Sequence, residues 1–363
     1  MASAASAQRP PAVVPARADA VLERLPRGYA QLMPARANAP LPQAQIERLL
    51  ATAARSGDAR LVARAEAALA RWPAADDTPA VLRARAYAAQ YRHDFPASLA
   101  LLARLVQRDP RDGDARLMRA QVWLVQGRLD AARAECATLA LSVDAAGGLL
   151  CAAALAHRRD DAARAAQLLD RWLQQAGPRD PSRRHALVMR AEAAAEVDSV
   201  NTDVADAWFR RALAAASDDV RTLAAYSRHL RETRRPREAH ALLVDTADSD
   251  HLLLERALAA HAARLDTAPA LIESLARRYR LARAAGSEPD LRDEAEFELT
   301  LRGDAAAALP LAQRNFASQR DREDVALLRR ASHAANRPEA LQPLHAWARA
   351  QRLDLRPLPA EVR

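Results

Sequence analysis

The chain has 363 residues, of which half are apolar, 4% are aromatic and nine are glycine. All 54 basic residues are arginine against 46 acidic residues, and because the two signs alternate without any block of five like charges, a polybasic or polyacidic tail is excluded. No apolar stretch approaches the roughly 18–20 residues of a membrane-spanning helix, and two cysteines are too few for a zinc cluster.

Residues 1–42 are rich in alanine, proline and arginine, and we expect a largely extended or disordered lead-in with one short helix at residues 18–25. Ala5-Ser6-Ala7 before Gln8 has the small-residue spacing of a signal-peptidase site. The charged and apolar regions of a signal peptide do not precede it, so a chance match in alanine-rich sequence is the alternative. The expected location is therefore the periplasm, with the cytoplasm as the alternative.

From Gln43 onward, apolar residues recur at helical spacing in paired runs separated by short polar breaks. Three of these breaks, at Gly57, His93 and Gly127, lie 36 and 34 residues apart. Strand-like alternation is absent. We predict about nine helical hairpins, covering residues 43–72, 79–112, 113–144, 147–177, 182–217, 220–246, 251–285, 291–319 and 322–352. Residues 353–363 contain two prolines and are predicted to form a loose tail.

The clearest unit is Gly113 to Asp144, in which Ala120, Trp123, Ala132 and Cys136 fall at fixed offsets. This pattern resembles a tetratricopeptide repeat, which has a small residue, an aromatic residue three positions on, and then alanine four positions before a large residue. Arg116 and Arg119 stand where the repeat has tryptophan and leucine. The resemblance implies an all-α fold, a right-handed α-solenoid of about nine antiparallel helix pairs.

In proteins of this kind the first helices line a concave groove that binds partner segments. Matching position by position, the resemblance assigns to this groove the side chains of Arg48, Arg55, Arg83, Tyr87, Gln90, Tyr91, Gln121, His157, Arg158, Glu192, Arg228 and Arg231. The paired asparagines with which chaperone-binding relatives hold a terminal carboxylate are absent from these positions. Arginine pairs planar carboxylates with two hydrogen bonds, so we predict an acidic protein or peptide partner.

Three function classes are open. The first is a protein-interaction scaffold without chemistry of its own. The second is a nucleic-acid-binding helical repeat, favoured by a pI near 10.4. Against it, aromatic residues for base stacking are scarce and the groove positions vary in type from unit to unit. An enzyme is the third class, but phosphate loops, nucleophile elbows and H-E-x-x-H motifs are lacking, and no metal or cofactor is expected. Because the lysine-free, arginine-rich composition is typical of a GC-rich genome, we expect a bacterial source.

Cys136 and Cys151 fall on consecutive helices of neighbouring units, which pack together in a solenoid. As a disulfide they would close a loop of about 15 residues, a constraint that contributes about 3 kcal/mol. The alternative is two separately buried thiols.

Overall fold

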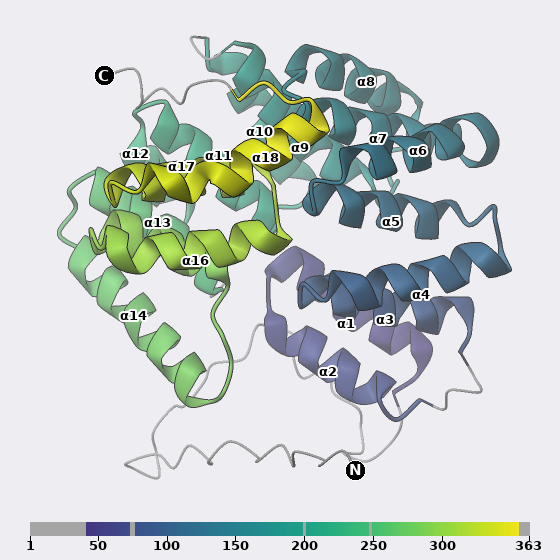
Figure 1. Cartoon of the computed structure of the whole chain (residues 1–363), viewed down its shortest axis with the longest axis horizontal. Coiled ribbons are helices and arrows are strands. Elements are labelled where there is room, and N and C mark those ends of the chain that lie inside the picture. The colour runs from purple at the N-terminus through teal and green to yellow at the C-terminus, as the bar shows by residue number, and fades with distance from the viewer. Residues whose placement is uncertain (1–40, 73–76, 199–200, 247–248, 356–363) are drawn as a thin grey trace.

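The computed structural model describes residues 41–72, 77–198, 201–246 and 249–355. The predicted lead-in and its short helix, the cleavage-site pattern and most of the tail lie outside these ranges. Within them, regular structure is entirely helical, and the predicted all-α solenoid of about nine helix pairs is confirmed (Figure 1). The helices are α1 (Gln43–Ser56), α2 (Ala59–Leu69), α3 (Pro79–Tyr91), α4 (Phe95–Arg108), α5 (Gly113–Val125), α6 (Leu129–Thr138), α7 (Ala145–Arg158), α8 (Ala162–Gln175), α9 (Arg183–Val197), α10 (Asp203–Ala215), α11 (Val220–Glu232), α12 (Pro236–Leu242), α13 (Asp250–Ala262), α14 (Ala268–Ala284), α15 (Leu291–Glu296), α16 (Ala305–Ser318), α17 (Arg322–Ala334) and α18 (Gln342–Gln351).

Two adjacent residues set the turn of several hairpins. The first has a left-handed backbone conformation, as at Gly57 (φ 69°) and His93 (φ 59°), which ends the first helix. The second is an aspartate whose side chain caps the next helix: Asp58 accepts from the Arg60 N–H and Asp94 from the Ala97 N–H. The same arrangement recurs at positions 160–161 and 303–304, so the 34-residue spacing seen in the sequence is the spacing of left-handed residues.

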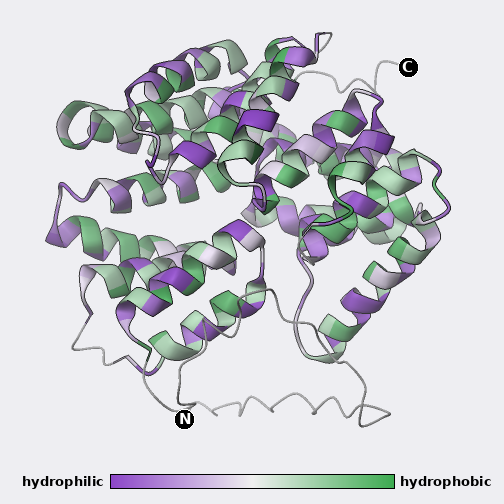
Figure 2. Cartoon of the chain, turned by 180° about the vertical axis from the view of Figure 1, so that it is seen from behind, coloured by the Kyte–Doolittle hydropathy of each residue, from purple (hydrophilic) through white to green (hydrophobic). Residues whose placement is uncertain are grey.

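Alanine dominates the contacts between helices. Ala53, Ala120, Ala132 and Ala191 are fully buried. Because an alanine side chain is small, neighbouring helix axes approach closely and each hairpin buries its apolar face against the next. Figure 2 shows hydrophobic and hydrophilic residues alternating along nearly every helix, as this arrangement requires.

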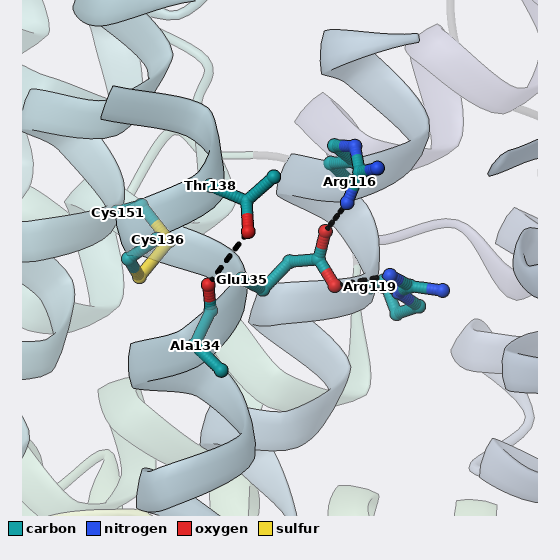
Figure 3. Close-up of a disulfide and its surroundings, with 7 residues drawn as sticks. All are labelled: Arg116, Arg119, Ala134, Glu135, Cys136, Thr138 and Cys151. Atoms are coloured by element: carbon teal, nitrogen blue, oxygen red, sulfur yellow. Dashed lines mark hydrogen bonds and ion pairs between the residues drawn. A yellow bond between two sulfur atoms is a disulfide. The ribbon is translucent and has the colours of Figure 1, made fainter. Parts of the chain in front are cut away.

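In the clearest repeat unit, Gly113–Asp144, the two departures from the consensus, Arg116 and Arg119, have a structural reason. Arg116 Nη1 donates to Glu135 Oε1 over 2.6 Å and Arg119 Nε donates to Glu135 Oε2 over 2.8 Å (Figure 3). Glu135 is only 7% exposed. The two arginines therefore replace apolar consensus residues by compensating a buried carboxylate, since a buried charge is tolerated when it is paired.

The residue after Glu135 is one half of a disulfide. The structure joins Cys136 at the end of α6 to Cys151 in α7, with Cα atoms 5.2 Å apart. Of the two alternatives that the sequence leaves open, the structure contains the cross-link, which ties two neighbouring repeat units together.

Candidate interaction surface

The row of first helices curves until its first member, α1, meets α11. Helix α1 contacts α3, α5 contacts α7, α7 contacts α9 and α9 contacts α11. Helix α4 links α3 to α5, and α1 also contacts α11, so the helices from α1 to α11 close into a ring. We call the surface that the first helices turn toward one another the inner face.

The ring closes where the C-terminal end of α1 meets the N-terminal end of α11. Arg55 Nε lies 3.0 Å from Asp218 Oδ2. A Cβ on Gly57 would lie 3.3 Å from a methyl group of Val220, so the backbone approaches closely here. Arginine at a helix C-terminus and aspartate before a helix N-terminus each suit the dipole of their own helix as well as one another.

The C-terminal hairpin makes a second closure against the turn between α5 and α6. Trp347 Nε1 donates to the Gly127 carbonyl over 2.9 Å, and the Arg320 N–H donates to the Val125 carbonyl over 2.7 Å. The Leu129 N–H donates to Gln351 Oε1 over 3.0 Å. The last repeat is therefore held against the third repeat.

This second closure brings the acidic start of α17 to the inner face. Asp321 pairs with Arg158 of α7. Glu323 Oε1 lies 2.9 Å from Arg228 Nη1, and Asp324 Oδ1 lies 2.6 Å from Arg292 Nε. We call this set the closed part of the inner face: Arg158, Arg228, Arg292, Asp321, Glu323 and Asp324.

The charges of the closed part balance. Burial disfavours the Arg228 guanidinium, but Glu323 and Glu192 outweigh it and raise the pKa of Arg228. Burial likewise raises the pKa of Glu323, but Arg228, Arg292 and Arg158 outweigh it and hold that pKa far below its ordinary value. Arg228 and Glu323 therefore stabilise one another, whereas burial raises the pKa of Asp324 despite its pair with Arg292. With three arginines facing three carboxylates, the closed part needs no external anion.

A second set of inner-face residues has the opposite electrostatics. We call Arg55, Tyr87, Arg184, His185 and Arg221 the basic part. Burial lowers the pKa of Arg184, and the positive charges of Arg221 and Arg55 lower it further. Burial also holds the pKa of His185 well below its ordinary value, again reinforced by Arg221 and Arg184.

The acidic residues near the basic part do not offset this lowering of the Arg184 pKa. Arg184 pairs with Asp219, which is buried. Arg221 Nη2 lies 3.4 Å from Glu192, a carboxylate that Arg228 approaches as well, and Arg221 Nη1 lies 2.9 Å from His185 Nδ1. The side chain of Arg221 is 47% exposed and that of Arg55 is 44% exposed. Cationic side chains thus crowd one another while remaining accessible to an anion from outside.

The residues predicted for the groove divide between these parts and intermediate positions. Arg158 and Arg228 belong to the closed part, and Arg55 and Tyr87 to the basic part. The others are placed as follows: Arg48 is exposed on α1, Arg83 pairs with Asp112 (2.8 Å), the Gln90 side-chain oxygen is buried, the Tyr91 hydroxyl lies 3.5 Å from the Gly57 carbonyl, Gln121 is half-buried, His157 Nε2 lies 2.7 Å from Glu196, and Arg231 pairs with Glu255 (2.8 Å).

Sequence reasoning missed Arg184, His185 and Arg221. Arg184 and Arg221 each occupy the second position of a first helix, α9 and α11. The groove assignment weighted later helical turns, whereas ring closure also brings these first turns to the inner face. A search for basic residues recurring in the first turn of first helices would have found them.

The described ranges hold no cluster of three or more histidine, cysteine or acidic side chains placed to bind a metal ion. Among the helices in these ranges, none has the length and apolar character needed to cross a membrane.

Comparison with known proteins agrees with the repeat architecture. Residues 91–153 match the tetratricopeptide repeat family. A tetratricopeptide repeat protein from Parabacteroides merdae is 16% identical, with 69% of this chain and 97% of that chain covered and a TM-score of 0.42. The Cut9–Hcn1 hetero-tetramer of the APC/C is 13% identical (79% and 62% covered, TM-score 0.36), and the P58(IPK) TPR domain is 16% identical (80% and 98% covered, TM-score 0.23). No curated protein matches the sequence.

The fold and the inner face together define an α-solenoid of helical hairpins, an architecture typical of protein-interaction scaffolds. Within this solenoid, the resemblance noted for Gly113–Asp144 is confirmed, because that unit lies inside residues 91–153, which match the tetratricopeptide repeat family.

Proposed function

We propose that this chain is a non-enzymatic interaction scaffold that binds an acidic segment of a partner protein at the basic part of its inner face. The observation that carries the proposal is the crowding of Arg55, Arg184 and Arg221: the first and last are 44% and 47% exposed, and their repulsion lowers the pKa of Arg184 beyond the effect of burial. A partner carboxylate placed among these groups would relieve that repulsion and accept bidentate hydrogen bonds from arginine.

The closed part supports this proposal, because arginines of the inner face already hold an acidic segment there. There, the acidic first turn of α17 is held by Arg158, Arg228 and Arg292 of the same chain. The inner face therefore already accommodates one acidic segment, and the basic part offers the same guanidinium chemistry on more exposed side chains. Burial raises the pKa of Tyr87 and the charge of Arg184 opposes that rise, so Tyr87 lies within electrostatic range of Arg184. Its rigid aromatic side chain loses little conformational entropy on binding.

The proposal is tested with a fluorescein-labelled peptide of alternating glutamate and alanine, blocked at both ends. We expect the Arg55→Gln/Arg221→Gln variant to bind it at least tenfold more weakly, which is about 1.4 kcal/mol. The control is Arg171→Gln/Arg179→Gln, which removes the same charge from exposed positions at the end of α8 and beyond it. Equal losses in both variants would reduce the attraction to diffuse charge and end the assignment.

The nucleic-acid alternative is tested with a second ligand. A single-stranded oligonucleotide that bound more tightly than the peptide, with an affinity falling steeply with salt, would favour the nucleic-acid alternative.

We also propose that the protein works in the periplasm of a bacterium. The disulfide between Cys136 and Cys151 supports this location, because disulfides persist in oxidising compartments and are rare in the cytosol. Fractionation of cells that express the native gene, with thiol titration of the unfolded, unreduced protein, tests it. A cytoplasmic product with two free thiols per chain would contradict both the location and the cross-link.

A further inference from the structure

We propose that a hollow on the outer side of the solenoid is a second binding site, for acidic peptide segments in which a carboxylate lies beside a leucine-sized apolar side chain. The hollow lies where α6, α7 and α8 meet, and it is separate from the inner face. We call it the outer hollow.

The outer hollow combines an apolar floor with a basic rim. It has a volume of about 370 Å³ and is lined by Arg133, Ala152, Leu155, Ala156, Arg159, Asp161, Arg164 and Leu168. A second, adjoining hollow of about 350 Å³ shares Arg159 and Asp161 and extends to Arg352, Leu353 and Asp354. Small alanines on α7 leave room above the floor, which suits one large apolar side chain and the groups next to it.

The guanidinium groups of the rim outnumber the carboxylates that can pair with them. Arg133 Nη2 lies 3.0 Å from Asp130 Oδ1, and Arg159 Nη2 lies 3.4 Å from the same oxygen. Asp130 is 69% exposed, so its attraction is weakened by water. Arg159 is 25% exposed, and its Nε is buried without a hydrogen-bond partner among the described residues.

Two of the other nearby carboxylates serve other groups, and a third, Asp354, is exposed in the adjoining hollow. Asp160 Oδ1 lies 2.6 Å from Arg322, and Asp161 Oδ1 accepts the Arg164 backbone N–H as the cap of α8. The side chains of Arg164 and Arg352 are exposed at the rim. Burial lowers the pKa of Arg159, and Arg133 and Arg352 lower it further despite the opposing effect of Asp130. An additional carboxylate at the rim would relieve this repulsion.

The floor selects a peptide over a simple anion. Leu155, Ala152 and Ala156 are partly exposed and offer apolar surface that inorganic phosphate cannot cover. A leucine next to a glutamate can bury itself there at about 25 cal/mol for each Å² removed from water. Arg158 is the last residue of α7, and Arg159 follows it as the C-cap. The end of one helix therefore serves the inner face with the first arginine and the outer hollow with the second.

The test uses a blocked, fluorescein-labelled peptide of alternating glutamate and leucine. It is titrated into protein that carries Arg55→Gln/Arg221→Gln, so that the inner face does not contribute. Adding Arg164→Gln/Arg352→Gln should weaken binding at least tenfold, and both residues are exposed, so folding should be retained. Adding Arg171→Gln/Arg179→Gln instead, with the same change in charge, should alter binding less than twofold. Ala152→Glu, which places a carboxylate over the floor, should also abolish binding, with helicity checked by circular dichroism.

The second part of the test varies the peptide. Replacing every glutamate by glutamine should abolish binding, and replacing every leucine by serine should weaken it at least fivefold. Equal losses from the rim and control variants would overturn the site. Insensitivity to the leucine replacement, with displacement by millimolar inorganic phosphate, would make it an anion site and overturn the peptide assignment. Because the inner face is already disabled, failure here leaves the proposed function standing.

Discussion

Two parts of the inner face carry arginines in opposite electrostatic states. In the closed part, Arg228 meets Glu323 and its pKa is raised. In the basic part, burial lowers the pKa of Arg184, and Arg221 and Arg55 lower it further. The residue type is the same, so the difference comes from which segment of the chain returns to face it.

The comparison teaches that arginine content alone does not locate a binding surface in this chain. Arg158 and Arg228 look like groove residues by position, yet the acidic start of α17 already satisfies them. On the first turns of α9 and α11, by contrast, Arg184 and Arg221 lie close to one another and to Arg55, and the pairs with Asp219, Glu192 and Asp218 do not keep the pKa of Arg184 from being lowered.

The closure that separates the two parts depends on Gly127. Its φ is 67°, and an added Cβ would lie 2.6 Å from Trp347 Nε1. We expect Gly127→Ala to lower the free energy of unfolding by about 2–4 kcal/mol, from left-handed strain plus overpacking. Gly303 has the same φ but open space around it, so Gly303→Ala should cost about 1–2 kcal/mol. Denaturant unfolding measures both, and equal costs would mean that the tryptophan contact contributes nothing.

Glu323→Gln should remove the carboxylate that pairs with Arg228 and so lower the free energy of unfolding. Its side chain is 34% exposed and that of Arg228 is 31% exposed, so we expect a loss of about 1–2 kcal/mol, between the values for surface and buried pairs. Asp218→Asn breaks the exposed pair with Arg55 and should cost about 0.5 kcal/mol or less.

The pH dependence of the Glu323 effect has a definite sign. The folded-state pKa of Glu323 lies below its unfolded value of about 4.3, so its stabilisation is present above about pH 4 and is lost as pH falls further. The stability difference between wild type and Glu323→Gln should therefore shrink below pH 4. A difference that stayed constant down to pH 2 would contradict the ion pairing.

His185 gives a smaller expected effect than Gly127 and reports on the electrostatics of the basic part. Its folded-state pKa lies below the unfolded value of about 6.5, so the protein should lose stability as pH falls below 6.5 toward that lower pKa. His185→Gln should remove this loss, which is on the order of 1 kcal/mol near pH 5.5. Binding of the glutamate–alanine peptide should raise the pKa of His185 in nuclear magnetic resonance titrations, and an unchanged pKa would place the peptide elsewhere.

Local chemistry made the hairpins predictable and long-range closure did not. Gly57 and Gly127 mark left-handed turns that sequence reasoning can find, and His93 at φ 59° follows from its spacing alone. The contact between Gly127 and Trp347 joins residues 220 positions apart, and no local pattern encodes it. The same holds for Arg184 and Arg221, which become neighbours of Arg55 only when α1 meets α11. The disulfide was predictable only in part: the spacing of the two cysteines placed them on adjacent helices but did not decide whether they bond.

The central claim is that an acidic segment binds the basic part and not the closed part. Photo-crosslinking tests it directly, with benzoylphenylalanine introduced either at Tyr87 or at Glu232, an exposed residue near Glu323 and Arg228. The glutamate–alanine peptide should crosslink to position 87 and not to position 232, with helicity retained in both proteins. Crosslinking at position 232 alone would show that the peptide enters the closed part, and the account would be wrong.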